Sequence, residues 1–122
     1  SVVSRARDLA ASSGAEILIT SDLQEACSGA HAIYTDVRVS MGQEEDADRR
    51  KKALAPSRVN EDAFRDADPS AIFMHCLPAH RGEEVEDEMI DGPRSVVIQQ
   101  AGNRLHAQKI LLEILAGEKN AV

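Results

Sequence analysis

The sequence predicts an α/β fold in which a mostly parallel sheet is flanked by helices. Short continuous apolar runs alternate with segments of helical periodicity along the 122 residues, and this alternation is typical of parallel strands covered by helices. Hydrophobic residues make up 43% of the chain, which is enough for one modest domain with its own core. Aromatic residues make up only 2%, so we expect that core to consist of Leu, Ile, Val and Ala.

The chain is expected to open with a helix and a strand. Apolar residues recur at helical spacing over residues 2–11 and predict a helix. The Ser12-Ser13-Gly14 stretch would end that helix. The apolar run Ile17-Leu18-Ile19 then predicts a short strand over residues 16–20.

Capping residues indicate where the next elements begin. Ser21 or Asp22 can cap a brief helix that runs to residue 26. Gly29 is expected to end that helix, and the apolar residues at 32–35 predict a second strand.

The middle of the chain is predicted to be helical and polar. Residues 44–54 carry acids first and bases last, which is the order that the helix dipole favours. Pro56 would end this helix, and Asn60 can cap another short helix that runs to residue 67.

Two further strands and two helices are predicted in the last part of the chain. Residues 71–75 and 95–98 are short apolar runs and predict the third and fourth strands. Residues 83–90 are expected to be helical, and residues 103–116 form a longer amphipathic pattern that predicts the last helix.

Charge and cysteine content exclude several classes of protein. The formal net charge of −7 argues against binding to nucleic acid or to an anionic membrane surface. No apolar run approaches the ~20 residues of a membrane span, and the first residues lack the pattern of a signal peptide. Two cysteines, Cys27 and Cys76, do not make a disulfide framework, so we expect a cytoplasmic protein in a reducing environment.

The sequence predicts neither a metal site nor a cofactor. His75 and His80 could form a pair of metal ligands, but no further ligand pattern accompanies them. The Gly-x-Gly-x-x-Gly turn of a dinucleotide-binding module does not occur. Cys27 is interpreted as a packing residue, because it lies in a short helical segment away from other reactive groups.

Side chains that can do chemistry follow three of the predicted strands. Asp36 follows the second strand, Cys76 the third, and Arg104 lies shortly after the fourth. Ligands of open α/β sheets bind outside the carboxyl ends of the strands, so these three groups are expected at one rim. An acid, a thiol and a guanidinium suit a substrate with an amine and a second substrate with an anionic or carbonyl oxygen.

Each of these three residues also has a structural interpretation. Asp36 could cap the following turn, Cys76 could be an inert buried thiol, and Arg104 could lie on the surface of a helix. The residue types and their spacing leave both interpretations open.

Three segments resemble those of a known enzyme family. Residues 35–44 (TDVRVSMGQE) are similar to the ornithine loop of ornithine carbamoyltransferases, residues 75–78 (HCLP) to their catalytic loop, and residues 100–109 (QAGNRLHAQK) to their carbamoyl-phosphate arginine segment. HCLP marks carbamoyltransferases broadly, whereas Asp-x-x-x-Ser-Met-Gly narrows the resemblance to the ornithine branch. The order and spacing of the three segments also match.

The resemblance implies a reaction and a role for each matching residue. Ornithine and carbamoyl phosphate would give citrulline and phosphate, with no cofactor. The Leu77–Pro78 bond is expected to be cis, which would aim the Leu77 carbonyl into the site. The implied roles are ornithine binding by Asp36, Ser40 and Met41, catalysis by Cys76 with Asp36, and carbamoyl-phosphate binding by Cys76, Leu77 and Arg104.

The chain also departs from the family pattern. Arg38, Gln99 and Gly102 stand where family members usually carry Trp, Asp and Glu, so two acids that could orient Arg104 are missing. The Ser-Thr-Arg-Thr loop and the His-Pro-x-Gln segment do not occur. Residues 1–122 are therefore expected to be the C-terminal part of a Rossmann-like ornithine-binding domain, with the N-terminal carbamoyl-phosphate domain absent.

Two other functions stay open at this point. The chain could be a non-catalytic fragment or paralogue that acts by binding or assembly, or a sister carbamoyltransferase that uses putrescine or another amine. The Ser40-Met41-Gly42 stretch argues against the sister enzyme. Intact family enzymes form homotrimers or multiples of them, so the resemblance implies an assembly of this kind.

Overall fold

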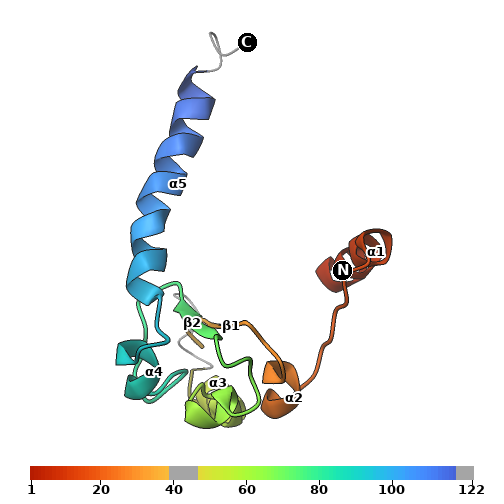
Figure 1. Cartoon of the computed structure of the whole chain (residues 1–122), viewed down its shortest axis with the longest axis vertical. Helices are drawn as coiled ribbons and strands as arrows, with labels where there is room; N and C mark the ends of the chain where they lie inside the picture. The colour runs from red at the N-terminus through yellow and green to blue at the C-terminus, as the bar shows by residue number, and fades with distance from the viewer. Residues whose placement is uncertain (39–46, 118–122) are drawn as a thin grey trace.

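The computed structural model describes residues 1–38 and 47–117 (Figure 1). The elements in chain order are helix α1 (Val2–Ser13), helix α2 (Leu23–Cys27), strand β1 (Ala32–Thr35), helix α3 (Ala47–Leu54), the 3-10 helices η2 (Ala55–Ser57) and η3 (Glu61–Phe64), strand β2 (Ile72–His75), helix α4 (Asp87–Asp91) and helix α5 (Val97–Gly117). Both strands lie in a central body, from which α1 and α5 extend. Among the described helices, none has the length and apolar character that crossing a membrane requires.

The sheet is parallel, as the sequence predicts. In the described part of the chain it has two strands, with Ala32 of β1 opposite Ile72 of β2 and Thr35 opposite His75. Ser95 adds a single parallel bridge to Phe73. Helices α3, η2 and η3 lie between the two strands in the sequence, which is the crossover that a parallel pair needs.

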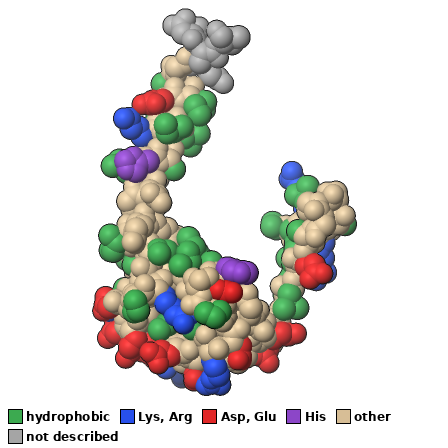
Figure 2. Space-filling model, viewed as in Figure 1, with side chains coloured by type: hydrophobic (Ala, Val, Ile, Leu, Met, Phe, Trp, Pro, Cys, Tyr) green, Lys and Arg blue, Asp and Glu red, His purple; other side chains and the backbone are tan. Residues whose placement is uncertain are grey.

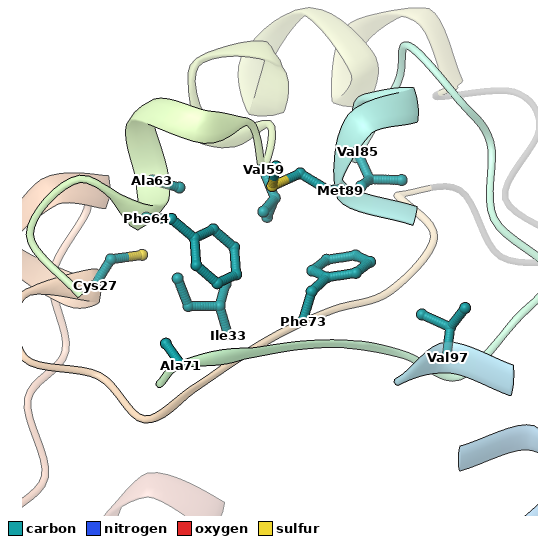
Figure 3. Close-up of a cluster of buried hydrophobic side chains, with 10 residues drawn as sticks. All are labelled: Cys27, Ile33, Val59, Ala63, Phe64, Ala71, Phe73, Val85, Met89 and Val97. Carbon is teal, nitrogen blue, oxygen red and sulfur yellow. The ribbon is translucent and has the colours of Figure 1, made fainter. Parts of the chain in front are cut away.

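The hydrophobic core lies against one face of the sheet (Figure 3). Successive side chains of a strand point to opposite faces, and the paired residues Ile33 and Phe73 share the buried face with 7% and 0% exposure. The buried cluster comprises Cys27, Ile33, Val59, Ala63, Phe64, Ala71, Phe73, Val85, Met89 and Val97. The position of Cys27 in this cluster agrees with its interpretation as a packing residue.

The expected composition of the core is wrong in part. Both phenylalanines of the chain, Phe64 and Phe73, are buried in it, and no leucine of the described residues is. One aromatic ring buries more apolar surface than an aliphatic side chain does, so two rings fill the centre of a small core.

Several predicted elements are confirmed with small changes at their ends. The first helix extends to Ser13 and ends at Gly14, whose φ of 76° is the left-handed conformation that glycine adopts without strain. Asp22 caps α2 by accepting hydrogen bonds from the amides of Gln24 and Glu25. Strands at 32–35 and 72–75 lie where they are predicted.

Two predicted strands are wrong. Residues 16–20 form no strand, because no other strand of the described residues lies beside them to accept a ladder of hydrogen bonds. Residues 95–98 contribute only the bridge at Ser95, because Val97 already begins α5. The last helix therefore starts six residues before the predicted position at 103.

Two predicted helices are shorter than expected, and a third is described only in part. The helix predicted at 83–90 begins only at Asp87, because the backbone of Val59 forms hydrogen bonds with the backbone of Glu84 and Glu86, which takes the place of helical hydrogen bonds there. The helix predicted at 60–67 is the single 3-10 turn η3, capped by Asn60 as predicted. The helix predicted at 44–54 is described from residue 47 onward, and residues 44–46 lie outside the described residues.

Candidate active site

The carboxyl ends of the two strands bring an acid and a thiol together. Thr35 and His75 are the last paired residues of β1 and β2, so the next residue of each strand lies at the same edge of the sheet. These residues are Asp36 and Cys76, and the Cys76 thiol donates a hydrogen bond of 2.9 Å to Oδ1 of Asp36. The same oxygen accepts a hydrogen bond of 2.6 Å from the amide of Val37. Forty residues of sequence separate the two groups, so the parallel register is what joins them.

The two groups shift each other's pKa in opposite directions. The hydrogen bond from Cys76, followed by that from the Val37 amide, lowers the pKa of Asp36 below its ordinary value. The hydrogen bond to Asp36, followed by burial, raises the pKa of Cys76. At neutral pH the shared proton therefore stays on sulfur, and the carboxylate keeps its negative charge. Such a pair offers a cationic or amine ligand an acceptor oxygen beside a polar thiol.

Tyr34 and Gln100 flank this pair. Tyr34 lies on β1, two residues before Asp36. Hydrogen bonding with Cys76 raises the pKa of Tyr34, the charge of Asp36 contributes to that rise, and hydrogen bonding with Gln100 opposes it. Oε1 of Gln100 also accepts a hydrogen bond of 3.1 Å from the amide of His75. The first turn of α5 is thereby attached to the end of β2.

Two buried side chains lie beneath the loop that follows β2. His75 is 0% exposed and Glu84 is 1% exposed. The Leu77 amide donates a hydrogen bond of 2.9 Å to Nδ1 of His75, and the His80 amide donates one of 2.5 Å to Oε1 of Glu84. The Leu77–Pro78 bond is cis, as predicted.

Comparison with known proteins places these features in a family. Residues 1–115 match the model of the aspartate/ornithine carbamoyltransferase Asp/Orn-binding domain. This chain belongs to that family. It is 54% identical to an ornithine carbamoyltransferase of Anoxybacillus flavithermus over 91% of this chain and 35% of that protein. It is 57% identical to one of Brucella abortus over 86% of this chain and 33% of that protein.

Solved structures of the carbamoyltransferase family have the same fold. The ornithine carbamoyltransferase of Pyrococcus furiosus is 54% identical with a TM-score of 0.77, over 85% of this chain and 33% of that one. The anabolic enzyme of Campylobacter jejuni is 37% identical with a TM-score of 0.86, over 93% of this chain and 37% of that one. The chain thus spans about a third of the length of the relatives it matches.

The remaining residues that the carbamoyltransferase resemblance singles out are not all in the described site. Ser40 and Met41 lie outside the described residues. Arg104 is exposed on α5, one turn after Gln100, and has no hydrogen bond or ion pair within the described part of the chain. Its place beside Cys76 stays a prediction. Among the residues that the structure describes, no three metal-ligating side chains lie together, and neither His75 nor His80 belongs to such a group.

Two residues of the site, Tyr34 and Glu84, were not predicted from the sequence. Tyr34 carries a usable signal, because it lies near the carboxyl end of the strand that precedes Asp36, where ligands of such sheets bind. Glu84 carries none, because it approaches His75 only through the chain reversal at residues 80–85, where Gly82 donates to the Val85 carbonyl. No periodicity marks that approach in advance.

Proposed function

We propose that this chain forms the ornithine-binding side of an ornithine carbamoyltransferase active site. The reaction is transfer of a carbamoyl group from carbamoyl phosphate to the side-chain amine of L-ornithine, which gives L-citrulline and phosphate. The observation that supports it most is the hydrogen bond between Cys76 and Asp36, formed by two residues of the matching motifs in a chain of the carbamoyltransferase family.

The chemistry of the pair fits an amine substrate. An ammonium group is no nucleophile, so ornithine must lose a proton before it attacks. The ionised Asp36 carboxylate accepts a hydrogen bond from the amine and orients it, and Cys76 supplies a second polar contact. Asp36 is proposed to bind ornithine together with Ser40 and Met41.

The transfer step balances without a covalent enzyme intermediate. The amine nitrogen forms a bond to the carbamoyl carbon, the bond from that carbon to the phosphate oxygen breaks, and phosphate leaves with the electron pair. The amine proton passes to an acceptor at the site. Arg104 and the backbone at Cys76 and Leu77 are proposed to bind carbamoyl phosphate and to stabilise the negative charge on its oxygen.

The rest of the proposed assembly follows from the family. We propose that residues 1–122 are the C-terminal part of the ornithine-binding domain, and that a carbamoyl-phosphate domain completes the site across the cleft. Homotrimeric assembly and participation in arginine metabolism are proposed on the same basis. Both cysteines are free, which is consistent with a cytoplasmic location.

A chimera tests the proposal. In the chimera, the matching segment of the Pyrococcus furiosus ornithine carbamoyltransferase is replaced by the residues of this chain; the match covers 33% of that protein. Citrulline formation from ornithine and carbamoyl phosphate is measured, with putrescine and aspartate offered as competing acceptors. We expect ornithine to be preferred.

Two outcomes would contradict the proposal. A folded, trimeric chimera without carbamoyl transfer would favour a non-catalytic role in binding or assembly. Faster carbamoylation of putrescine or aspartate would make the chain part of a sister enzyme, with Arg38 as the first position to exchange for Trp, because it departs from the family pattern within the ornithine loop.

A further inference from the structure

We propose that His75 and Glu84 are positioning residues that fix the backbone of residues 76–80, and so hold Cys76 against Asp36. This inference rests on the proposed function, since it gives the catalytic loop its support. The two buried side chains bind one amide each, at Leu77 and at His80, so they hold the loop at two points three residues apart.

The contacts of His75 define its protonation state. Nδ1 accepts a hydrogen bond from the Leu77 amide, so Nδ1 carries a lone pair and the proton of the neutral ring is on Nε2. Nε2 lies 3.3 Å from Oε1 of Glu84, although the two are not aligned as a hydrogen bond. Both ring nitrogens therefore face groups other than the Cys76 thiol, which donates to Asp36. His75 thus acts on the backbone and not as a base toward sulfur.

The backbone at Leu77 needs this support. Its φ of 54° lies in the left-handed region, which costs a residue other than glycine on the order of 1–3 kcal/mol and persists only where the surroundings hold it. The hydrogen bond from the Leu77 amide to the His75 side chain holds the backbone in this conformation. Since Cys76 precedes Leu77 directly, release of Leu77 would also turn the thiol.

Glu84 provides the second point of attachment. It is 1% exposed, and the carbonyl of its own backbone accepts a hydrogen bond of 2.9 Å from Val59 in the core. The backbone of Glu84 is therefore attached to the core, while Oε1 of its side chain accepts the hydrogen bond from the His80 amide. Arg38, which is also buried, lies close enough that Glu84 opposes the lowering of its pKa by burial. Glu84 thus binds the loop after β2 and acts electrostatically on Arg38.

Two substitutions of His75 separate positioning from packing. The Oδ1 of His75→Asn can take the place of Nδ1 and accept from the Leu77 amide, but this side chain cannot reach Glu84. His75→Gln fills more of the space and reaches toward Glu84, but has no acceptor at the δ position. If His75 only fills space, His75→Gln should resemble the unsubstituted protein more closely than His75→Asn does. If His75 positions the backbone, His75→Asn should resemble it more closely.

The full chain is tested first. Cys76 alkylation by iodoacetamide is followed against pH, and the 15N shifts of the His75 ring are measured in the unsubstituted chain. We expect an unprotonated Nδ1, and an alkylation midpoint that falls in His75→Gln but not in His75→Asn. A protonated Nδ1, or the reverse ranking, would overturn the inference even where a variant fails to fold. His31→Gln is the matched control, because His31 has an 81% exposed side chain.

Kinetics in the chimera complete the test. Misplacement of a reacting group by about 1 Å can cost on the order of 100-fold in rate, so we expect kcat to fall by about that factor in His75→Gln. The conservative Glu84→Gln, which keeps an acceptor for the His80 amide, should retain most of kcat, and Glu84→Ala should not. An active chimera with equal kcat in both His75 variants would refute positioning alone, whereas an inactive unsubstituted chimera would refute the proposed function and leave the alkylation result standing.

Discussion

The sheet body and the two outer helices use the same apolar residues with different results. In the body, Phe73 and Val85 are both 0% exposed. On α1 and α5, Leu9 and Leu112 are 61% and 65% exposed, and Figure 2 shows hydrophobic side chains along the surface of both helices. Apolar side chains at this density on a helix normally pack against another element. The difference shows that the described residues build a site edge but do not cover their own outer helices.

The largest effect is expected from removing the rest of a family enzyme. The 122-residue chain alone should form no citrulline, because carbamoyl phosphate needs several cationic and backbone donors held together, and carbamoyl transfer depends on domain closure around both substrates. The measurement is a citrulline assay on the purified chain with both substrates in excess. Turnover within about tenfold of an intact relative would show that this chain alone suffices to position both substrates. The exposed helices α1 and α5 would then need no further covering for activity.

The next largest effect concerns the acid of the site. In the chimera, Asp36→Asn should lower kcat/KM for ornithine on the order of 100-fold, because the carboxylate that accepts a hydrogen bond from the amine and orients it is lost. Asp8→Asn on the exposed surface of α1 is the control and should change little. Steady-state kinetics with ornithine as the varied substrate measure both. If the two variants retain equal activity, Asp36 contributes no more to catalysis than an exposed acid on α1 does.

A stability pair tests the comparison directly. Phe73→Ala should lower the free energy of unfolding of the chain by about 3–5 kcal/mol, because it opens a cavity at a fully buried ring. Leu112→Ala on α5 should cost less than about 0.5 kcal/mol, because that side chain is largely exposed. Urea unfolding at two protein concentrations measures both. A comparable cost for Leu112→Ala that grows with concentration would mean that copies of the chain cover each other's outer helices.

Cys76→Ser should have a smaller effect on the reaction than Asp36→Asn. A serine hydroxyl can donate the same hydrogen bond to Asp36, and the proposed step forms no bond to sulfur. In the chimera we expect Cys76→Ser to use ornithine less well but to retain measurable turnover, with kcat/KM about tenfold below that of the unsubstituted enzyme. This loss is smaller than the roughly 10²–10⁴-fold that removal of a proton-transfer group typically costs. Isolation of a carbamoylated Cys76 that goes on to form citrulline would show that the thiol is the nucleophile.

The motif residues were predictable from the sequence to different degrees. Asp36 and Cys76 each follow an apolar run, so the rule for parallel sheets predicted their common edge, and the structure adds the bond between them. The contact of Glu84 with the catalytic loop was not predictable, because it depends on the path of the turn after Pro78. Residues 16–20 have the composition of a strand, yet a strand exists only where a neighbour pairs with it. Local patterns therefore show which residues can form an element, whereas the presence of a neighbour decides whether a strand forms.

The smallest expected effect is a shift in the reactivity of Cys76 with pH. Its pKa is raised chiefly by the hydrogen bond to Asp36, so the protonated, bonded thiol is the form present at neutral pH, and the bond is lost as pH rises through that raised value. Alkylation by iodoacetamide should therefore reach half of its maximal rate at a higher pH than a free thiol does. In Asp36→Asn the midpoint should fall, because the carboxylate that holds the thiol proton and repels the thiolate is gone. Mass spectrometry of the alkylated peptides separates Cys76 from Cys27, which is 5% exposed and serves as the slow internal control. An unchanged midpoint in Asp36→Asn would mean that burial and not Asp36 raises the pKa of Cys76. The thiol would then behave as a buried core residue and not as part of an open site.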